Sequence, residues 1–229
     1  MYMLDAGFTI LRRQLQRSSL GSRRVIVGGP AKRLFDIVAA SLIIICIVPL
    51  IVFVSLAMKL LDPGPVIYPH TRIGHCGRRF KCLKFRSMVV GADEVLKALL
   101  ASDPEIRDIW ERTQKLPNDP RITPWGRFLR HSSLDELPQL INVLRGDMSL
   151  VGPRPIVPSE MARYGDKLGL YLSARPGLTG LWQISGRSDC SYDRRIELDA
   201  EYVRYWRFST DLIILLRTVG AVIARKGVY

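Results

Sequence analysis

The stretch IVAASLIIICIVPLIVFVSLAM, residues 37–58, contains no charged side chain, although 24% of the residues in the whole chain are charged. As an α-helix this run would extend about 33 Å, close to the roughly 30 Å hydrocarbon core of a bilayer. The run therefore predicts a membrane helix. It decides the fold class, because the remaining residues must then form a domain at the membrane surface.

Basic side chains flank this apolar run on both sides. Residues 1–33 and residues 59–86 each carry seven Lys or Arg side chains and one acid. Because Lys and Arg favour the cytoplasmic side of a membrane, neither end is expected outside. Pro49 lies just past the middle of the run, where it removes a backbone hydrogen bond and kinks the helix. A re-entrant helix bent at Pro49 satisfies both flanks, and a kinked spanning helix is the alternative.

The remainder of the chain predicts a mainly α-helical fold with one small β-hairpin. Turn residues bracket two β-rich segments in DPGPVIYPHTRIGHCGRRFKCLKFRSM, residues 62–88. Helical spacing follows over residues 91–114, and Thr123 followed by Pro124 is typical of a capped helix start. A helix over residues 135–145 is expected to end at Gly146. Two further helices are expected over residues 192–206 and 210–225.

These patterns divide the chain into three parts. Residues 1–31 are expected to form a mobile basic N-terminal tail, and residues 32–60 the re-entrant membrane helix. Residues 61–229 are expected to form a cytoplasmic globular domain with amphipathic C-terminal helices at the membrane interface. The apolar positions of the last helix fit an interfacial helix, and packing in the core is the alternative.

The charge of the chain predicts an anionic partner. Lys and Arg number 34 against 21 Asp and Glu, which gives a net charge of +13. Nucleic acid, anionic membrane lipids and a phosphorylated substrate would all suit this charge. A nucleic-acid module needs aromatic residues interleaved with basic ones, or a recognition helix, and the sequence has neither. We therefore expect anionic lipids, and no nucleic acid, as partners. A membrane-tethered module that only binds an anionic partner is the alternative to an enzyme that acts on a phosphorylated substrate.

Two adjacent acids, Asp135 and Glu136, stand in SLDELPQL, residues 133–140. They fit a capping box, with Ser133 as the N-cap and Glu136 three residues later. Pro138 weakens this interpretation, because it would remove a hydrogen bond within the helix. The alternative is chemistry, since adjacent carboxylates at a helix start can hold Mg²⁺ together with substrate phosphates. The local pattern leaves both interpretations open.

Arginines on stiff loops favour phosphate chemistry. Arg130 precedes the acid pair, and Arg154 stands between two prolines in GDMSLVGPRP, residues 146–155. Arg175 and Arg187 begin and end RPGLTGLWQISGR, residues 175–187. Guanidinium groups bind phosphate through two parallel hydrogen bonds, and a rigid loop reduces the entropy lost in holding them. A structural subunit of an export complex would not need such loops.

Several long motifs give the chain a close resemblance to a known family. They are KRLFDIVAASLIIICIVPL (32–50), YPHTRIGHCGRRFKCLKFRSM (68–88), DPRITPWGRFLRHSSLDELPQLINVLRGDMSLVGPRP (119–155), RPGLTGLWQISGR (175–187) and ARKGVY (224–229). The chain resembles the monotopic phosphoglycosyl transferases, the bacterial polyprenyl-phosphate sugar-1-phosphate transferases. It is most similar to the branch that adds the first sugar, often galactose or glucose, in exopolysaccharide assembly.

The resemblance implies a covalent mechanism. Asp135 would attack the β-phosphorus of a UDP-sugar, release UMP and hold a phospho-sugar, and Mg²⁺ near Asp135 would offset charge on the diphosphate. Glu136 would help to activate undecaprenyl phosphate as the second substrate. Arg130, Arg154 and Arg187 match family arginines near the phosphates.

The resemblance also implies a location. The apolar helix would be re-entrant, with the active site on the cytoplasmic face of the bacterial inner membrane. The family often has Ser before the proline at the bend, whereas this chain has Val48 before Pro49. The sequence does not fix the oligomeric state and allows a homodimer.

Overall fold

A computed structural model describes residues 26–113, 116, 118–185 and 191–223 of the chain. The described part is mainly helical, with two small two-stranded sheets and one long apolar helix, α2 (Gly29–Leu61). Among the described residues, α2 is the one helix long and apolar enough to cross a membrane, and its most apolar window has a mean hydropathy of 3.2. Residues 1–25 of the expected N-terminal tail and residue Arg187 lie outside the described residues, and the last three residues of that expected tail, 29–31, belong to α2.

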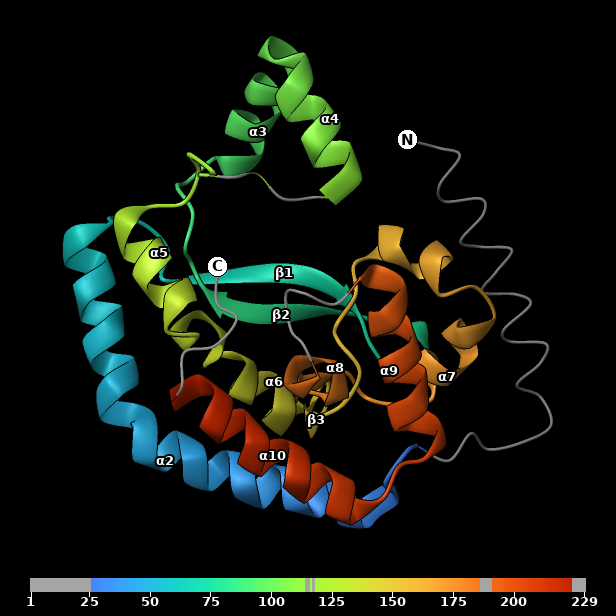
Figure 1. Ribbon diagram of the computed structural model, residues 1–229. Helices are drawn as coiled ribbons and strands as arrows, with labels where there is room; N and C mark the ends of the chain where they lie inside the picture. Colours follow the sequence, from blue (N-terminus) through green and yellow to red (C-terminus); the bar gives the residue numbers. More distant parts are fainter. Residues whose placement is uncertain (1–25, 114–115, 117, 186–190, 224–229) are drawn as a thin grey trace.

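Helix α2 is bent, and both of its halves pack on the rest of the protein (Figure 1). Figure 1 shows that the helix changes direction along its length, and Pro49 lies inside it, where the lost backbone hydrogen bond is expected to cause a bend. In the first half, the fully buried Ala40 belongs to the main core. In the second half, Val54 and Met58 pack against Phe85 and Leu129 in a separate apolar cluster.

The predicted hairpin is confirmed. Strands β1 (Ile67–Ile73) and β2 (Arg79–Phe85) pair antiparallel, and the short 3₁₀ helix η1 (His75–Gly77) lies in the turn between them. His70 pairs with Cys82 and Tyr68 pairs with Lys84. Because side chains alternate along a strand, Lys84 and the buried Cys82 project from the same face of β2.

Two helices, α3 (Ala92–Ser102) and α4 (Pro104–Thr113), stand at the edge of the molecule (Figure 1). The expectation of one continuous helix over residues 91–114 was wrong, because the helix ends before Asp103. The Asp103 side chain accepts hydrogen bonds from the amides of Glu105 and Ile106 at 2.9 and 3.2 Å, and Pro104 begins the second helix. This is the ordinary way in which an acidic cap and a proline start a helix.

The next elements carry the acid pair. Helix α5 (Pro124–His131) is capped as predicted, since the Thr123 hydroxyl accepts a hydrogen bond from the Gly126 amide at 2.9 Å. A 3₁₀ helix, η2 (Leu134–Glu136), precedes α6 (Gln139–Arg145). The α-helix therefore begins after Pro138, four residues later than expected, and it ends at Gly146 as expected.

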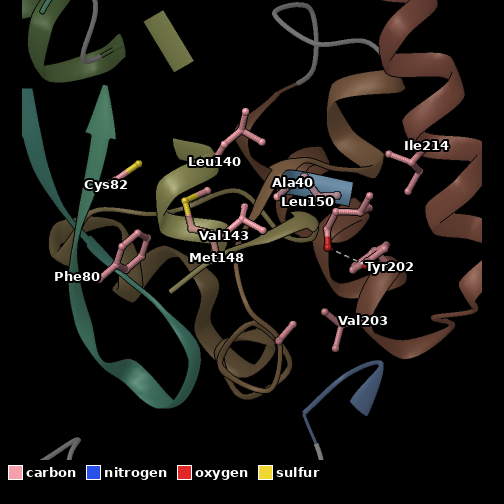
Figure 2. Packing of buried hydrophobic residues seen from close by; sticks show 12 residues of the cluster. Ala40, Phe80, Cys82, Leu140, Val143, Met148, Leu150, Tyr202, Val203 and Ile214 are labelled. Carbon is pink, nitrogen blue, oxygen red and sulfur yellow. Dashed lines mark hydrogen bonds between the residues drawn. The ribbon is translucent and has the colours of Figure 1, made fainter. Parts of the chain in front are cut away.

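A second sheet and a set of short helices complete the core. Strands β3 (Ser149–Val151) and β4 (Gly177–Thr179) pair in parallel. Between them lie η3 (Pro158–Lys167) and α7 (Leu168–Leu172), and α8 (Leu181–Ile184) follows. Figure 2 shows side chains from the hairpin, α6, β3 and the C-terminal helices meeting in this core, among them Phe80, Leu140 and Leu150.

The last two helices of the described chain are α9 (Tyr192–Arg204) and α10 (Phe208–Ile223). Ile214 of α10 is fully buried, whereas Leu212, Ile213, Leu216 and Val219 are exposed. One face of α10 thus packs in the core, as the alternative prediction had it, and the other face is apolar and exposed.

Charged groups attach the start of α2 to the start of α10. The buried Lys32 ammonium forms an ion pair with the fully buried Asp211 carboxylate. The Tyr202 hydroxyl donates a hydrogen bond to Asp211 at 2.7 Å, and the Trp206 indole donates one at 3.1 Å. Because a buried charge is costly without partners, this network fixes where α2 leaves the globular body.

Candidate active site

The backbone around the two acids excludes the capping box. Ser133 has a φ of 58°, a left-handed conformation that is uncommon for a residue other than glycine, and its side chain makes no capping hydrogen bond. Pro138, not Ser133, precedes α6. Asp135 and Glu136 lie in the 3₁₀ turn between these two residues, so the capping interpretation was wrong.

The acids share one cation, Lys84, at the end of β2. The Lys84 ammonium lies 2.7 Å from a Glu136 carboxylate oxygen and 3.7 Å from an Asp135 carboxylate oxygen. Asp135 is only 8% exposed. The hairpin therefore supplies a positive charge between the two carboxylates, which brings together residues about fifty positions apart in the sequence.

The surroundings shift the pKa values of the two carboxyl groups in opposite directions. Burial, together with the neighbouring Glu136, raises the pKa of Asp135 to about 6 against the attraction of Lys84 and Arg130. Burial also opposes ionisation of Glu136, but the charge and hydrogen bond of Lys84 outweigh it and lower the Glu136 pKa. Two acids with separated pKa values are suited to different roles. Asp135 is the more basic carboxylate and is still ionised at neutral pH.

Two of the four predicted arginines lie beside these acids. The Arg130 guanidinium donates a hydrogen bond to the Ser87 hydroxyl at 2.8 Å, and its charge lowers the pKa of Asp135. The Arg154 charge likewise lowers the pKa of Glu136. The acid pair therefore lies within electrostatic reach of two guanidinium groups in addition to Lys84.

The other two predicted arginines are placed differently. Arg175 donates a hydrogen bond from Nε to the Gly146 carbonyl at 3.0 Å, and it lies within electrostatic reach of Arg33 and Asp36 of α2. The structure thus brings Arg175 to the end of α6 and the start of α2, and it does not bring Arg175 to the acid pair. Arg187 lies outside the described residues.

Residues that were not predicted also build the site. Asp199 of α9 accepts hydrogen bonds from the Tyr164 hydroxyl at 2.8 Å and from the Arg154 amide at 3.3 Å. Arg72 of β1 donates to the Pro155 carbonyl at 3.1 Å. The hydrogen bonds between Asp199 and the Arg154 amide and between Arg72 and the Pro155 carbonyl hold the loop that carries Arg154. The only sequence signal for Lys84 was its place in FKCLKF, where strand alternation puts it on the same face as buried Cys82.

The donor set of the site fits a hard cation only in part. The described residues contain no group of three or more His, Cys, Asp or Glu side chains that could hold a metal ion. Asp135 and Glu136 offer carboxylate oxygens, and Glu136 is already engaged by Lys84. A Mg²⁺ ion at Asp135 would therefore need substrate phosphates and water as most of its ligands, an arrangement that Mg²⁺ accepts.

The chain matches known proteins over most of its length. Residues 27–225 match the family described as bacterial sugar transferase. The chain is 54% identical over 198 residues to the undecaprenyl-phosphate galactose phosphotransferase of Salmonella typhimurium, covering 86% of this chain and 41% of that relative.

Two further relatives differ in length. The exopolysaccharide production protein ExoY of Rhizobium meliloti is 49% identical over 203 residues, which cover 89% of this chain and 90% of ExoY. The UDP-glucose:undecaprenyl-phosphate glucose-1-phosphate transferase of Escherichia coli is 41% identical over 207 residues, covering 86% of this chain and 41% of that relative. The chain spans less than half of the Salmonella and Escherichia relatives and nearly all of ExoY. By these matches the chain belongs to the bacterial sugar transferase family.

Proposed function

We propose that this enzyme transfers a sugar-1-phosphate, with galactose or glucose as the sugar, from a UDP-sugar to undecaprenyl phosphate and releases UMP. The reaction would be the first membrane step of exopolysaccharide synthesis. The names of the galactose and glucose phosphotransferases and of ExoY support the substrates and the pathway. The observation that carries the chemistry is the buried Asp135 carboxylate, held between Lys84, Glu136 and Arg130.

The reaction would proceed in two displacements at phosphorus. In the first, an Asp135 oxygen attacks the β-phosphorus of the UDP-sugar, the bond to the bridging oxygen breaks, and UMP leaves with the bonding electrons. In the second, an oxygen of undecaprenyl phosphate attacks the same phosphorus and frees the Asp135 carboxylate. Lys84 and Arg130 would offset charge on the attacked phosphate, since phosphoryl transfer depends on positioning and charge stabilisation.

Glu136 would act in the second displacement, in which undecaprenyl phosphate is the attacking group. Its lowered pKa keeps it ionised, and the acceptor is a phosphate monoester with a second pKa of about 6. Most of the acceptor is therefore already a dianion at neutral pH, and Glu136 would have to accept a proton only from the monoanion. Mg²⁺ held by Asp135 and the diphosphate oxygens would supply further positive charge.

We propose that α2 is re-entrant and that residues 32–60 enter and leave the membrane on its cytoplasmic side. The contacts at the two ends of α2 support this arrangement. Its start is tied to the body by Lys32 and Asp211, and just after its end Asp62 pairs with Arg86 at 3.2 Å. The exposed apolar face of α10 would lie in the interface beside anionic lipids, with residues 61–229 as the catalytic domain and residues 1–31 as a basic tail.

Cysteine labelling tests this topology. Single cysteines replace Ser22 and the exposed hairpin residue Arg78 in a variant without native cysteines, and intact cells are treated with an impermeant maleimide. We expect no labelling at either site until the cells are lysed, because both flanks would face the cytoplasm. Labelling of one site in intact cells would show that α2 spans the membrane.

The function is tested by UMP release from purified enzyme. UDP-galactose and UDP-glucose are supplied separately with undecaprenyl phosphate and Mg²⁺, and we expect UMP and a lipid-linked sugar diphosphate with at least one of them. The rate should fall as the pH is lowered through about 6, because protonated Asp135 is no longer a nucleophile. Binding of anionic vesicles without UMP release from a panel of UDP-sugars would favour the rival membrane-tethered binding module.

A further inference from the structure

Two arginines from different elements meet over one indole ring. The guanidinium carbon of Arg154 lies 5.2 Å from the centre of the Trp182 ring, and that of Arg195, on α9, lies 4.5 Å from it. The Nε atoms of both arginines are buried and have no hydrogen-bond partner within the described part of the chain. A guanidinium group can donate hydrogen bonds but cannot accept them, so these two buried donors would be satisfied by an acceptor such as an anion.

The positive charges around this pair are only partly offset by the nearby acids Asp199 and Glu160. Burial and the Arg154 charge together lower the pKa of Arg195, and the same two causes lower that of Arg72. The nearby acids already have partners. Glu160 accepts a hydrogen bond from the Val157 amide at 2.8 Å and lies 3.8 Å from Arg72. Asp199 accepts hydrogen bonds from Tyr164 and from the Arg154 amide. Like charges held together in a partly buried site favour binding of an anion.

The location of Arg195 favours a water-soluble anion. Helix α9 runs toward α10, and Arg195 lies nine residues before its last residue, Arg204, a distance of about 14 Å along the axis. The exposed apolar surface lies on α2 and α10, at the other end of α9 (Figure 1). A lipid phosphate would approach from that apolar surface, whereas a nucleotide would approach from water.

We propose that Arg195, together with Arg154, binds the phosphate of the UDP-sugar that leaves as part of UMP. This inference rests on the proposed function and assigns a residue to one part of its substrate. In the proposed reaction Asp135, Lys84 and Arg130 would surround the phosphate that is attacked. Arg154, which lies within electrostatic reach of Glu136, would connect the two positions. Two guanidinium groups would stabilise the negative charge that UMP acquires when the bridging bond breaks.

The test compares Arg195→Gln and Arg195→Lys with Arg194→Gln. Arg194 is the matched control, because it is adjacent, 54% exposed at its side chain, and paired with Glu197 at 3.0 Å. We expect Arg195→Gln to raise the KM for the UDP-sugar and to weaken inhibition by UMP, each by about 10- to 100-fold, as for a lost charged hydrogen bond. Arg195→Lys should show a smaller change, and Arg194→Gln should match the wild type.

Two measurements make the result decisive. The KM for undecaprenyl phosphate should stay unchanged, and calorimetric binding of UMP should weaken in Arg195→Gln while its thermal unfolding shows an intact fold. Unchanged UMP binding, or a raised KM for undecaprenyl phosphate alone, would overturn the assignment. If the wild type binds UMP through Arg195 but releases none from a UDP-sugar, the proposed function fails and the phosphate site stands.

Discussion

Replacing Asp135 with Asn should reduce UMP release by about a thousandfold or more, the scale expected when a covalent nucleophile is removed. Asn keeps the size of the side chain but cannot form an acyl phosphate. The fold should survive, because the site disfavours the charged form of Asp135 and a neutral amide removes that cost. Steady-state UMP release and thermal unfolding of the purified variant check both parts.

Two comparisons sharpen this result. Asp93→Asn is the control, because Asp93 is an exposed acid in the first turn of α3, and it should leave turnover unchanged. Glu136→Gln should mainly slow the step that uses undecaprenyl phosphate, so a covalent phospho-sugar should accumulate when both substrates are supplied. An Asp135→Asn enzyme with normal turnover would show that this carboxylate is not the nucleophile.

Replacing Arg154 with Lys should lower kcat/KM for the UDP-sugar by about 100-fold or more, the scale expected when one preorganised donor is lost from a transition-state site. Lysine keeps the positive charge but loses the planar fork that can donate two hydrogen bonds and stack on Trp182. The loop should remain in place, since Asp199 binds the backbone amide of residue 154 and not its side chain.

The control for Arg154 is Arg78→Lys in the exposed turn of the hairpin, which should behave like the wild type. Kinetics should be accompanied by a measurement of the free energy of unfolding, so that loss of packing on Trp182 is separated from loss of catalysis. Near-normal turnover of Arg154→Lys would place this guanidinium outside the transition-state site.

Patterns within short windows predicted most of the fold. The uncharged run predicted α2, Pro49 predicted a bend in that helix, and the Thr123–Pro124 pair predicted the start of α5. Helix boundaries were predicted wrongly where two local sequence signals favoured different structures. The break at Asp103 interrupts an apolar spacing that continues on both sides, and the start of α6 moved to Gln139 because η2 precedes Pro138.

Short motifs drew attention to some of the residues that the structure brings together, and not to others. Asp135, Arg130 and Arg154 stood in recognisable motifs, whereas Lys84 and Asp199 act through partners more than forty residues away in the sequence. Periodicity cannot show such pairings, because they depend on how the hairpin and α9 pack. Arg175 had the same local signal as Arg154, yet its contact with Gly146 places it at the end of α6.

Covalent trapping tests the central claim most directly. The enzyme is mixed with a UDP-sugar labelled at the β-phosphate, without undecaprenyl phosphate, and the label is located by peptide mapping. We predict label on the peptide that contains Asp135, loss of that label in Asp135→Asn, and its release when undecaprenyl phosphate is added. Turnover with no labelled protein, or label on a different residue, would contradict the account.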